Sequence, residues 1–134
     1  MTNDFLERLL IDTLNGRGYF APVVSAVLRN GNSIAVMVTP SNNYRHYYDG
    51  SFEQSFTFQI MTKHEDELLA YQTLLAISSF LTTIPDIPSE NDSYEFNQLN
   101  ITTSPNVIGQ DEKYFIYGAQ FSAELYFKGV ETDG

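Results

Sequence analysis

The residues of this chain that could do chemistry are two histidines, seventeen Asp and Glu, and the hydroxyl side chains. His46 and His64 are far apart in the sequence, and Asp49 or the run Glu65-Asp66-Glu67 could join either of them around a zinc ion. Their spacing matches no known zinc site. Because a surface histidine beside acids is common, we interpret His46 as a loop residue and His64 as the residue that precedes a helix. The sequence therefore predicts no metal and no cofactor.

Other catalytic arrangements also lack a signature. Pairs such as Asp66-Glu67 occur by chance in any chain with this many acids, and acid–base catalysis requires a desolvated cleft that a sequence does not show. The chain has no cysteine, which excludes disulfides, thiolate zinc sites and cysteine nucleophiles. It contains neither GxGxxG nor GxxxxGK[ST], so a phosphate-binding loop is not expected. We predict that the protein is not an enzyme. The alternative, an enzyme without a local motif, requires a buried acid with a raised pKa in a deep pocket.

The composition indicates one folded domain over residues 1–134, with residues 129–134 as a flexible tail. The net charge of −10 opposes binding to phosphate backbones, although it would not stop the protein from surrounding DNA without gripping it. No apolar run approaches the ~20 residues of a membrane span, and the first four residues lack the positive charge of a signal peptide. We expect a cytoplasmic protein without membrane association.

The hydrophobic pattern predicts an α+β fold with the element order α-β-β-β-α-β-β. The first helix is expected over about residues 3–15, with Asn15-Gly16 at its end. The second helix opens at the acids 65–67 and is stopped by Pro85 and Pro88. Its buried face is expected to consist of Leu69, Ala70, Thr73, Leu74, Ile77, Phe80, Leu81 and Ile84.

Five strands are expected between and after these helices. Residues 23–28 and 33–39 are predicted to form a hairpin around Asn30-Gly31, a strong two-residue turn signal. Residues 51–63 and 115–127 alternate apolar and polar side chains, and a further strand is expected over 94–103. Loops are expected at 40–50, 84–92 and 104–113. We predict a mostly antiparallel sheet with both helices packed on one face, which leaves the other face open to solvent or to a neighbour.

Three groups of residues are candidates for binding other proteins. The loop 40–50 contains Tyr44, Arg45, Tyr47 and Tyr48, and Tyr and Arg often dominate binding energy at protein interfaces. Alternatively, these tyrosines fold back over the chain's own sheet.

On the second helix, Leu68, Tyr71 and Leu75 recur opposite the buried stripe, where they either lie under the first helix or meet another subunit. The last strand has an outward row with Ile116 and Tyr126, which suits an interface or an ordinary exposed sheet.

The chain resembles the minor capsid or tail-terminator (tail completion) proteins of long-tailed phages of Gram-positive bacteria. The residues that carry the resemblance are Phe5-Leu6-Glu7-Arg8-Leu9-Leu10, the turn Tyr48-Asp49-Gly50, the stretch from Phe56 to His64, and the stretch from Asp111 to Tyr117 with the long strand behind it. The likeness spans about residues 4–128. Its motifs are structural, not catalytic.

The resemblance implies a homo-oligomeric ring, usually a hexamer, that caps the tail tube, ends tube growth and joins the tail to the head connector. Its partners would be the tail tube protein and the head–tail connector protein, and DNA would pass through the lumen without specific binding. The protein would lie in the host cytoplasm during assembly and then in the virion tail. We expect the second helix and the open sheet face to supply the subunit contacts, and the loops 40–50 and 104–112, with Asp111 and Glu112, to reach axially toward tube or connector. The alternatives are another head–tail connector or completion protein, or a small peptide- or ligand-binding module.

Overall fold

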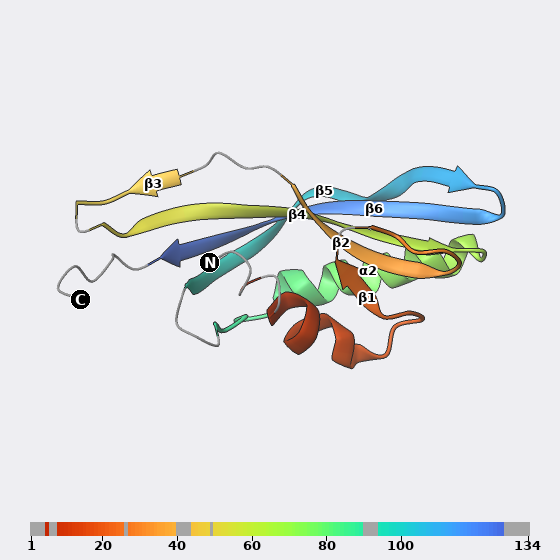
Figure 1. The fold of residues 1–134 in the computed structure, drawn as a ribbon, viewed down its shortest axis with the longest axis horizontal. Coiled ribbons are helices and arrows are strands. Elements are labelled where there is room, and N and C mark those ends of the chain that lie inside the picture. Colours follow the sequence, from red (N-terminus) through yellow and green to blue (C-terminus); the bar gives the residue numbers. More distant parts are fainter. Residues whose placement is uncertain are drawn as a thin grey trace.

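The computed structural model describes residues 5, 8–25, 27–39, 44–48, 50–89 and 94–127. The predicted flexible tail, 129–134, and most of the residues expected to start the first helix lie outside these ranges. The described chain forms a long six-stranded sheet with helical segments on one side (Figure 1). The strands are β1 (Val23–Ser25), β2 (Ser33–Thr39), β3 (Tyr44–His46), β4 (Phe52–His64), β5 (Glu95–Asp111) and β6 (Tyr114–Phe127). Their order in the sheet is β1-β2-β4-β6-β5, and β3 also pairs with β4.

The two central strands, β4 and β6, match the alternation expected for them. Phe56, Phe58 and Ile60 of β4 are buried, and so are Ala119, Phe121, Ala123, Leu125 and Phe127 of β6. The two strands pair antiparallel along their whole length, and the rings of Phe58 and Phe121 stack at 5.2 Å. Since alternate residues of a strand point to opposite faces, this row defines the core face of the sheet.

The helix α2 (Glu67–Thr83) covers the core face. Asp66 caps its N-terminus by accepting hydrogen bonds from the backbone N–H groups of Leu68 and Leu69, as helix-capping aspartates do. Its buried residues are Ala70, Thr73, Leu74, Ile77, Ser78 and Leu81. The Thr62 hydroxyl of β4 donates a 2.8 Å hydrogen bond to the carbonyl of Ala70, which fixes the helix on the sheet. The helix prediction is confirmed, including its end just before Pro85.

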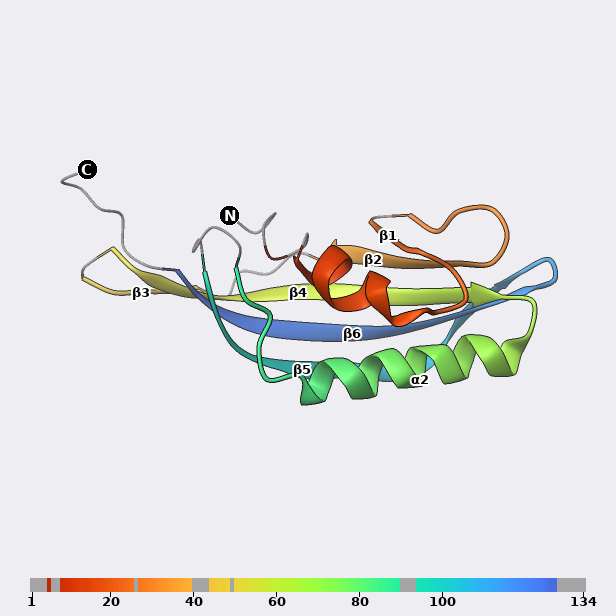
Figure 2. The same ribbon diagram turned by 90° about the horizontal axis from the view of Figure 1, so that it is seen from below.

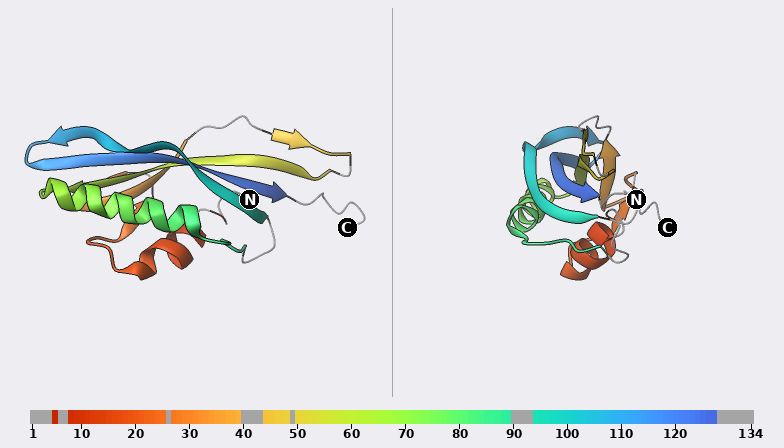
Figure 3. Two further views of the ribbon diagram at one scale, coloured as in Figure 1. Left: turned by 180° about the vertical axis from the view of Figure 1, so that it is seen from behind. Right: turned by 90° about the vertical axis from the view of Figure 1, so that its left-hand side faces the viewer.

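The N-terminal helix is not the regular α-helix that was expected over residues 3–15. The structure has a π-helical segment, η1 (Arg8–Leu14), followed by the 3₁₀ turn η2 (Asn15–Arg17). In a π-helix each backbone hydrogen bond joins residues five apart, and Leu9 and Leu14, which have this spacing, are both buried. These two leucines and Phe5 join the core beneath the sheet. Figure 3 shows this segment and α2 on the same side of the curved sheet. Over residues 8–127, as far as the structure describes them, the α+β class therefore fits, with the α-helix α2 and the π-helical segment η1.

The expected hairpin around Asn30-Gly31 is wrong. β1 runs parallel to β2, with Val23 opposite Ile34. Gly31 does adopt the positive φ of 77° that the turn signal requires, but side-chain contacts fix the connection to the end of β4. The backbone N–H of Glu65 donates to the side-chain oxygen of Asn32 at 3.2 Å. These long-range contacts override the local turn preference.

Residues 104–111, expected as a loop, are the second half of β5. Four register shifts interrupt its pairing with β6, one of them between Thr103 and Asn106, which spans Pro105. A bulge lets a strand absorb a proline that cannot donate to the ladder, and the Asn106 side chain donates to the carbonyl of Gly118 at 3.3 Å. The strand turns into β6 at Glu112, whose φ is +55°. The loop expected at 40–50 likewise contains β3, so His46 is a strand residue, not a loop residue.

Candidate subunit interface

An exposed apolar surface lies along the outer side of α2. Leu68 is 61% exposed and Leu75 is 40% exposed, whereas Tyr71 between them is half-buried. The ring of Tyr71 packs at 5.3 Å from that of Tyr117 on β6, and the exposed Val107 lies opposite Tyr117 on β5. We call Leu68, Tyr71, Leu75 and Val107 the α2 flank. Helical spacing brings its first three members to one side of the helix, as the sequence suggested.

Glu67 provides a negative charge at one end of the α2 flank. Its carboxylate accepts a 2.8 Å hydrogen bond from the Tyr117 hydroxyl, and this bond is the main reason that the pKa of Tyr117 is raised above its ordinary value. Glu67 is the sole charged residue among residues 67–83. The α2 flank is therefore an apolar strip with one fixed carboxylate and no helical cation near it.

A second exposed apolar surface lies at the opposite edge of the sheet, where β1 pairs with β2 (Figure 2). β1 pairs with residues Ile34 to Val36 only, so the last three residues of β2 have no pairing with β1. Val38 continues the inward pattern of Ile34 and Val36 but is 47% exposed, and Val27 after β1 is 69% exposed. We call Val27 and Val38 the β1–β2 patch. Sequence reasoning missed it, because its exposure depends on how short β1 is.

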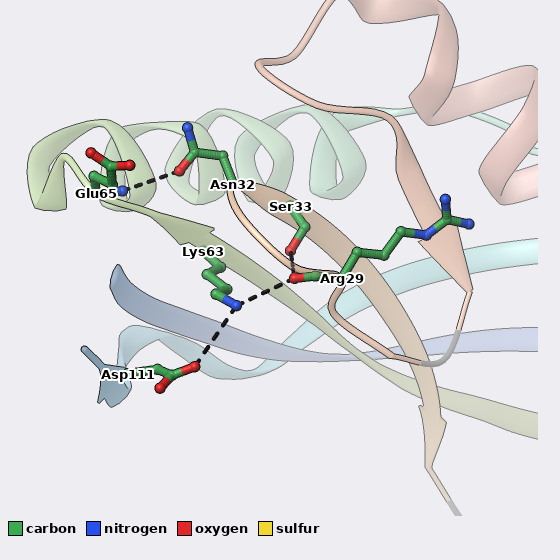
Figure 4. Close-up of polar contacts among 6 residues, drawn as sticks. All are labelled: Arg29, Asn32, Ser33, Lys63, Glu65 and Asp111. Atoms are coloured by element: carbon green, nitrogen blue, oxygen red, sulfur yellow. Dashed lines mark hydrogen bonds and ion pairs between the residues drawn. The ribbon is translucent and has the colours of Figure 1, made fainter. Parts of the chain in front are cut away.

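The connection between β1 and β2 is held firmly at its base (Figure 4). The carbonyl of Arg29 accepts hydrogen bonds from the Ser33 hydroxyl and from the Lys63 ammonium, each at 3.3 Å. The same ammonium lies 3.9 Å from a carboxylate oxygen of Asp111. The guanidinium of Arg29 points away from these groups, and it makes no hydrogen bond or ion pair with the described part of the chain. The connection thus carries an exposed valine, Val27, and two residues later an exposed arginine, Arg29.

The other candidates for subunit contacts lie on the face of β6 that the helices do not cover. Ile116 and Tyr126 are both half-buried and pair with Lys63 and Glu53 of β4, near the two ends of the strand pair. Between them, the Glu124 carboxylate accepts hydrogen bonds from Ser55 and Ser122. The structure therefore places Ile116 and Tyr126 on a different surface from Leu68, Tyr71 and Leu75.

The candidates for axial contacts fall at two separate places. Tyr47 and Tyr48 are exposed in the turn between β3 and β4, which is closed by a 2.9 Å hydrogen bond from the N–H of Tyr47 to the carbonyl of Ser51. Asp111 and Glu112 are exposed at the turn between β5 and β6. The two hairpin tips lie at opposite ends of the long axis (Figures 1 and 2).

Two further candidates, Tyr44 and Arg45, belong to β3, but their side chains lie outside the described part of the structure.

The side chains that could take part in catalysis or metal binding include His64. His64 Nδ1 accepts a 2.9 Å hydrogen bond from the N–H of Asp66, and its ring packs edge-on against Phe20, so it does lie at the entry to a helix. Over the residues that the structure describes, no three His, Asp or Glu side chains gather as a metal site. Nor does any described helix have the length and apolar character needed to span a bilayer.

Comparison with known proteins matches this fold to a family. Residues 28–127 match the family model described as "Bacteriophage tail terminator protein". The chain belongs to this family. Among solved structures, a chain in the virion of a native gene transfer agent particle has a similar fold, with a TM-score of 0.58, 14% identity and 94% of each chain covered. No curated protein matches the chain.

Membership of the tail terminator family makes the protein a structural component of the phage tail, found in the virion. The α2 flank and the β1–β2 patch lie at opposite edges of the sheet, and the two hairpin tips lie at opposite ends of the molecule. In this tail terminator, the α2 flank, the β1–β2 patch and the two hairpin tips are thus separate exposed regions of the molecule.

Proposed function

We propose that the protein forms a homo-hexameric ring that caps the tail tube, stops the addition of further tube subunits and joins the tail to the head connector. The observation that carries the proposal is the presence of two different exposed apolar surfaces on opposite edges of one sheet. A ring requires head-to-tail contacts, in which each subunit offers two unlike patches. The α2 flank and the β1–β2 patch fulfil this requirement.

Burial of apolar side chains would favour the proposed contact. Burial of a Val or Leu side chain contributes about 1.5–3 kcal/mol, and a side chain that is already half-buried contributes about half of that. Leu68, Val107 and Val27 are each more than half exposed, so they would add several kcal/mol at every subunit contact. In a closed ring this contribution is repeated at each contact, which favours the closed form over shorter oligomers.

The hairpin tips supply the axial contacts in this proposal. One tip carries Tyr47 and Tyr48 and the other carries Asp111 and Glu112, so the two ends of the molecule differ in chemistry. A cap needs such a difference, because one side meets the tail tube protein and the other meets the head connector protein. The net charge of −10 agrees with a lumen through which DNA passes without specific binding.

The decisive measurement is the mass of the assembly, alone and with purified tail tubes, by light scattering and electron microscopy. The wild-type protein should form a ring, or form one on the end of a tube. The double variant L68E/L75E should stay monomeric and leave tube growth uncapped, because it places charges in the proposed contact. The matched control is A76E/T83E, which adds the same charge at two exposed positions on the side of α2 that is turned away from Tyr71. A wild-type protein that stays monomeric and leaves tube growth unchanged would rule the proposal out.

A further inference from the structure

We infer that Arg29 and Val27 of one copy of this chain bind Glu67 and the α2 flank of the next copy. This inference rests on the proposed ring and names the residues that would hold it together. The partner of the free Arg29 guanidinium is then a carboxylate of a second copy. The partner of the exposed Val27 side chain is the exposed Leu68 next to that carboxylate.

The charges of the chain single out Arg29. The chain has seven Lys and Arg, and five of these side chains lie in the described residues. Arg17 stacks on the ring of Phe80 at 3.7 Å, Lys63 is bound at the base of the β1–β2 connection, and Lys113 lies 3.3 Å from Glu65. Arg8 is buried and has its own contacts. Arg29 is exposed, and its charged group has no partner within the described part of the chain.

The α2 flank offers the complementary charge. No Lys or Arg occurs from residue 67 to residue 83, so Glu67 has no cation on its own helix. The Tyr117 hydroxyl holds one oxygen of the Glu67 carboxylate and leaves the other available to a guanidinium. A carboxylate that is already oriented loses less entropy when it binds. An arginine with an adjacent apolar residue, set against a carboxylate with an adjacent leucine, is complementary in charge and in hydropathy.

The two side chains do not meet within one chain. The Arg29 guanidinium points away from the end of β4 that leads into α2, and the Glu67 carboxylate is bonded to Tyr117 of β6. Because the two surfaces differ, each added copy leaves one free Arg29 and one free α2 flank until the assembly closes. The contact therefore specifies head-to-tail assembly.

Charge reversal tests the contact. R29E and E67R should each weaken assembly by about tenfold or more, because each puts like charges together. The double variant R29E/E67R should recover assembly to within about threefold of the wild type. Since E67R also removes the hydrogen bond from Tyr117, E67Q serves as a control that retains an acceptor. Thermal melts of each monomer report folding separately.

An engineered disulfide gives an independent readout, because the chain has no cysteine of its own. Under oxidation, the double variant V27C/L68C should give a ladder that ends at the copy number of the ring. A mixture of V27C and L68C should give dimers and nothing larger. Cross-linking of either single variant with itself would overturn the inference, and so would failure of R29E/E67R to recover. If wild-type rings still form in that case, the proposed function stands and this contact alone is wrong.

Discussion

The hydroxyl of Tyr117, on β6, donates a 2.8 Å hydrogen bond to the carboxylate of Glu67, in the first turn of α2. The Tyr117 ring also packs against Tyr71, one turn further along the helix. The N-terminal end of α2 is thus fixed to the sheet by a polar and an aromatic contact beside the exposed Leu68. This arrangement makes the α2 flank a rigid surface, and rigid surfaces bind with a smaller entropy loss.

The first prediction concerns stability at alkaline pH. The pKa of Tyr117 is raised in the folded protein, chiefly by the hydrogen bond to Glu67. A raised pKa means that the neutral phenol is favoured on folding. The stability that this pKa shift of Tyr117 contributes is therefore fully present below the unfolded pKa of about 10, and it is lost as the pH rises through the folded pKa. In urea unfolding at a series of pH values above neutral, Y117F should lose less stability toward high pH than the wild type.

A direct measurement of this pKa provides the control. In E67Q the carboxylate is replaced by a neutral amide, so the pKa of Tyr117 should move back toward its ordinary value. Carbon-13 NMR of the labelled tyrosine ring would follow it. An unchanged Tyr117 titration in E67Q would show that Glu67 is not the cause of the shift.

The second prediction concerns the helix cap. Asp66 accepts hydrogen bonds from the N–H groups of Leu68 and Leu69 at 3.1 and 3.3 Å. Removal of an N-cap acceptor costs about 0.5–2 kcal/mol, so D66A should lower the free energy of unfolding by that amount. D66N should cost less, because Asn is also a good cap. Equal losses in D66A and D66N would show that the negative charge matters and the cap does not.

The third prediction concerns the centre of the core. Phe58 and Phe121 are fully buried and stack at 5.2 Å across β4 and β6. Truncation of a buried Phe to Ala costs about 3–5 kcal/mol through lost burial and a residual cavity. F58A and F121A should each lower the free energy of unfolding by that amount in chemical denaturation. Because the rings touch, the double variant should cost less than the sum of the two. An additive double variant would show that the stacked pair has no interaction energy of its own.

The elements that sequence reasoning predicted well are those with apolar residues on one side and polar residues on the other. In β4 and β6 each alternate residue enters the core, and in α2 the buried stripe returns every three or four residues. The positions of Leu68 and Leu75 follow directly from this helical spacing. Local pattern was sufficient here, because burial of one side determines the element and its register.

The elements that were predicted wrongly are those determined by distant contacts. Asn30-Gly31 favours a hairpin locally, but Lys63 and Glu65 hold this connection from β4. Pro105 normally indicates a loop, yet the long partner strand β6 keeps β5 paired across a bulge. The β1–β2 patch could not be foreseen for the same reason. Val27 and Val38 look like core residues, and their exposure follows from the three-residue length of β1.

The last prediction is that the two ends of the molecule bind different partners. The β3–β4 tip presents Tyr47 and Tyr48, and the β5–β6 tip presents Glu112. The double variant Y47S/Y48S and the variant E112K should both fold with near wild-type stability, because surface substitutions usually change it by less than about 0.5 kcal/mol. One variant should lose binding to the tail tube and the other should lose binding to the connector, and each should still bind the remaining partner. Pull-down of each variant with isolated tubes and with isolated connectors would measure this. Loss of the same partner by both variants would mean that the two tips do not face opposite ways in the tail. The long axis of each subunit would then run around the circumference of the ring, and neither tip would point along the tube.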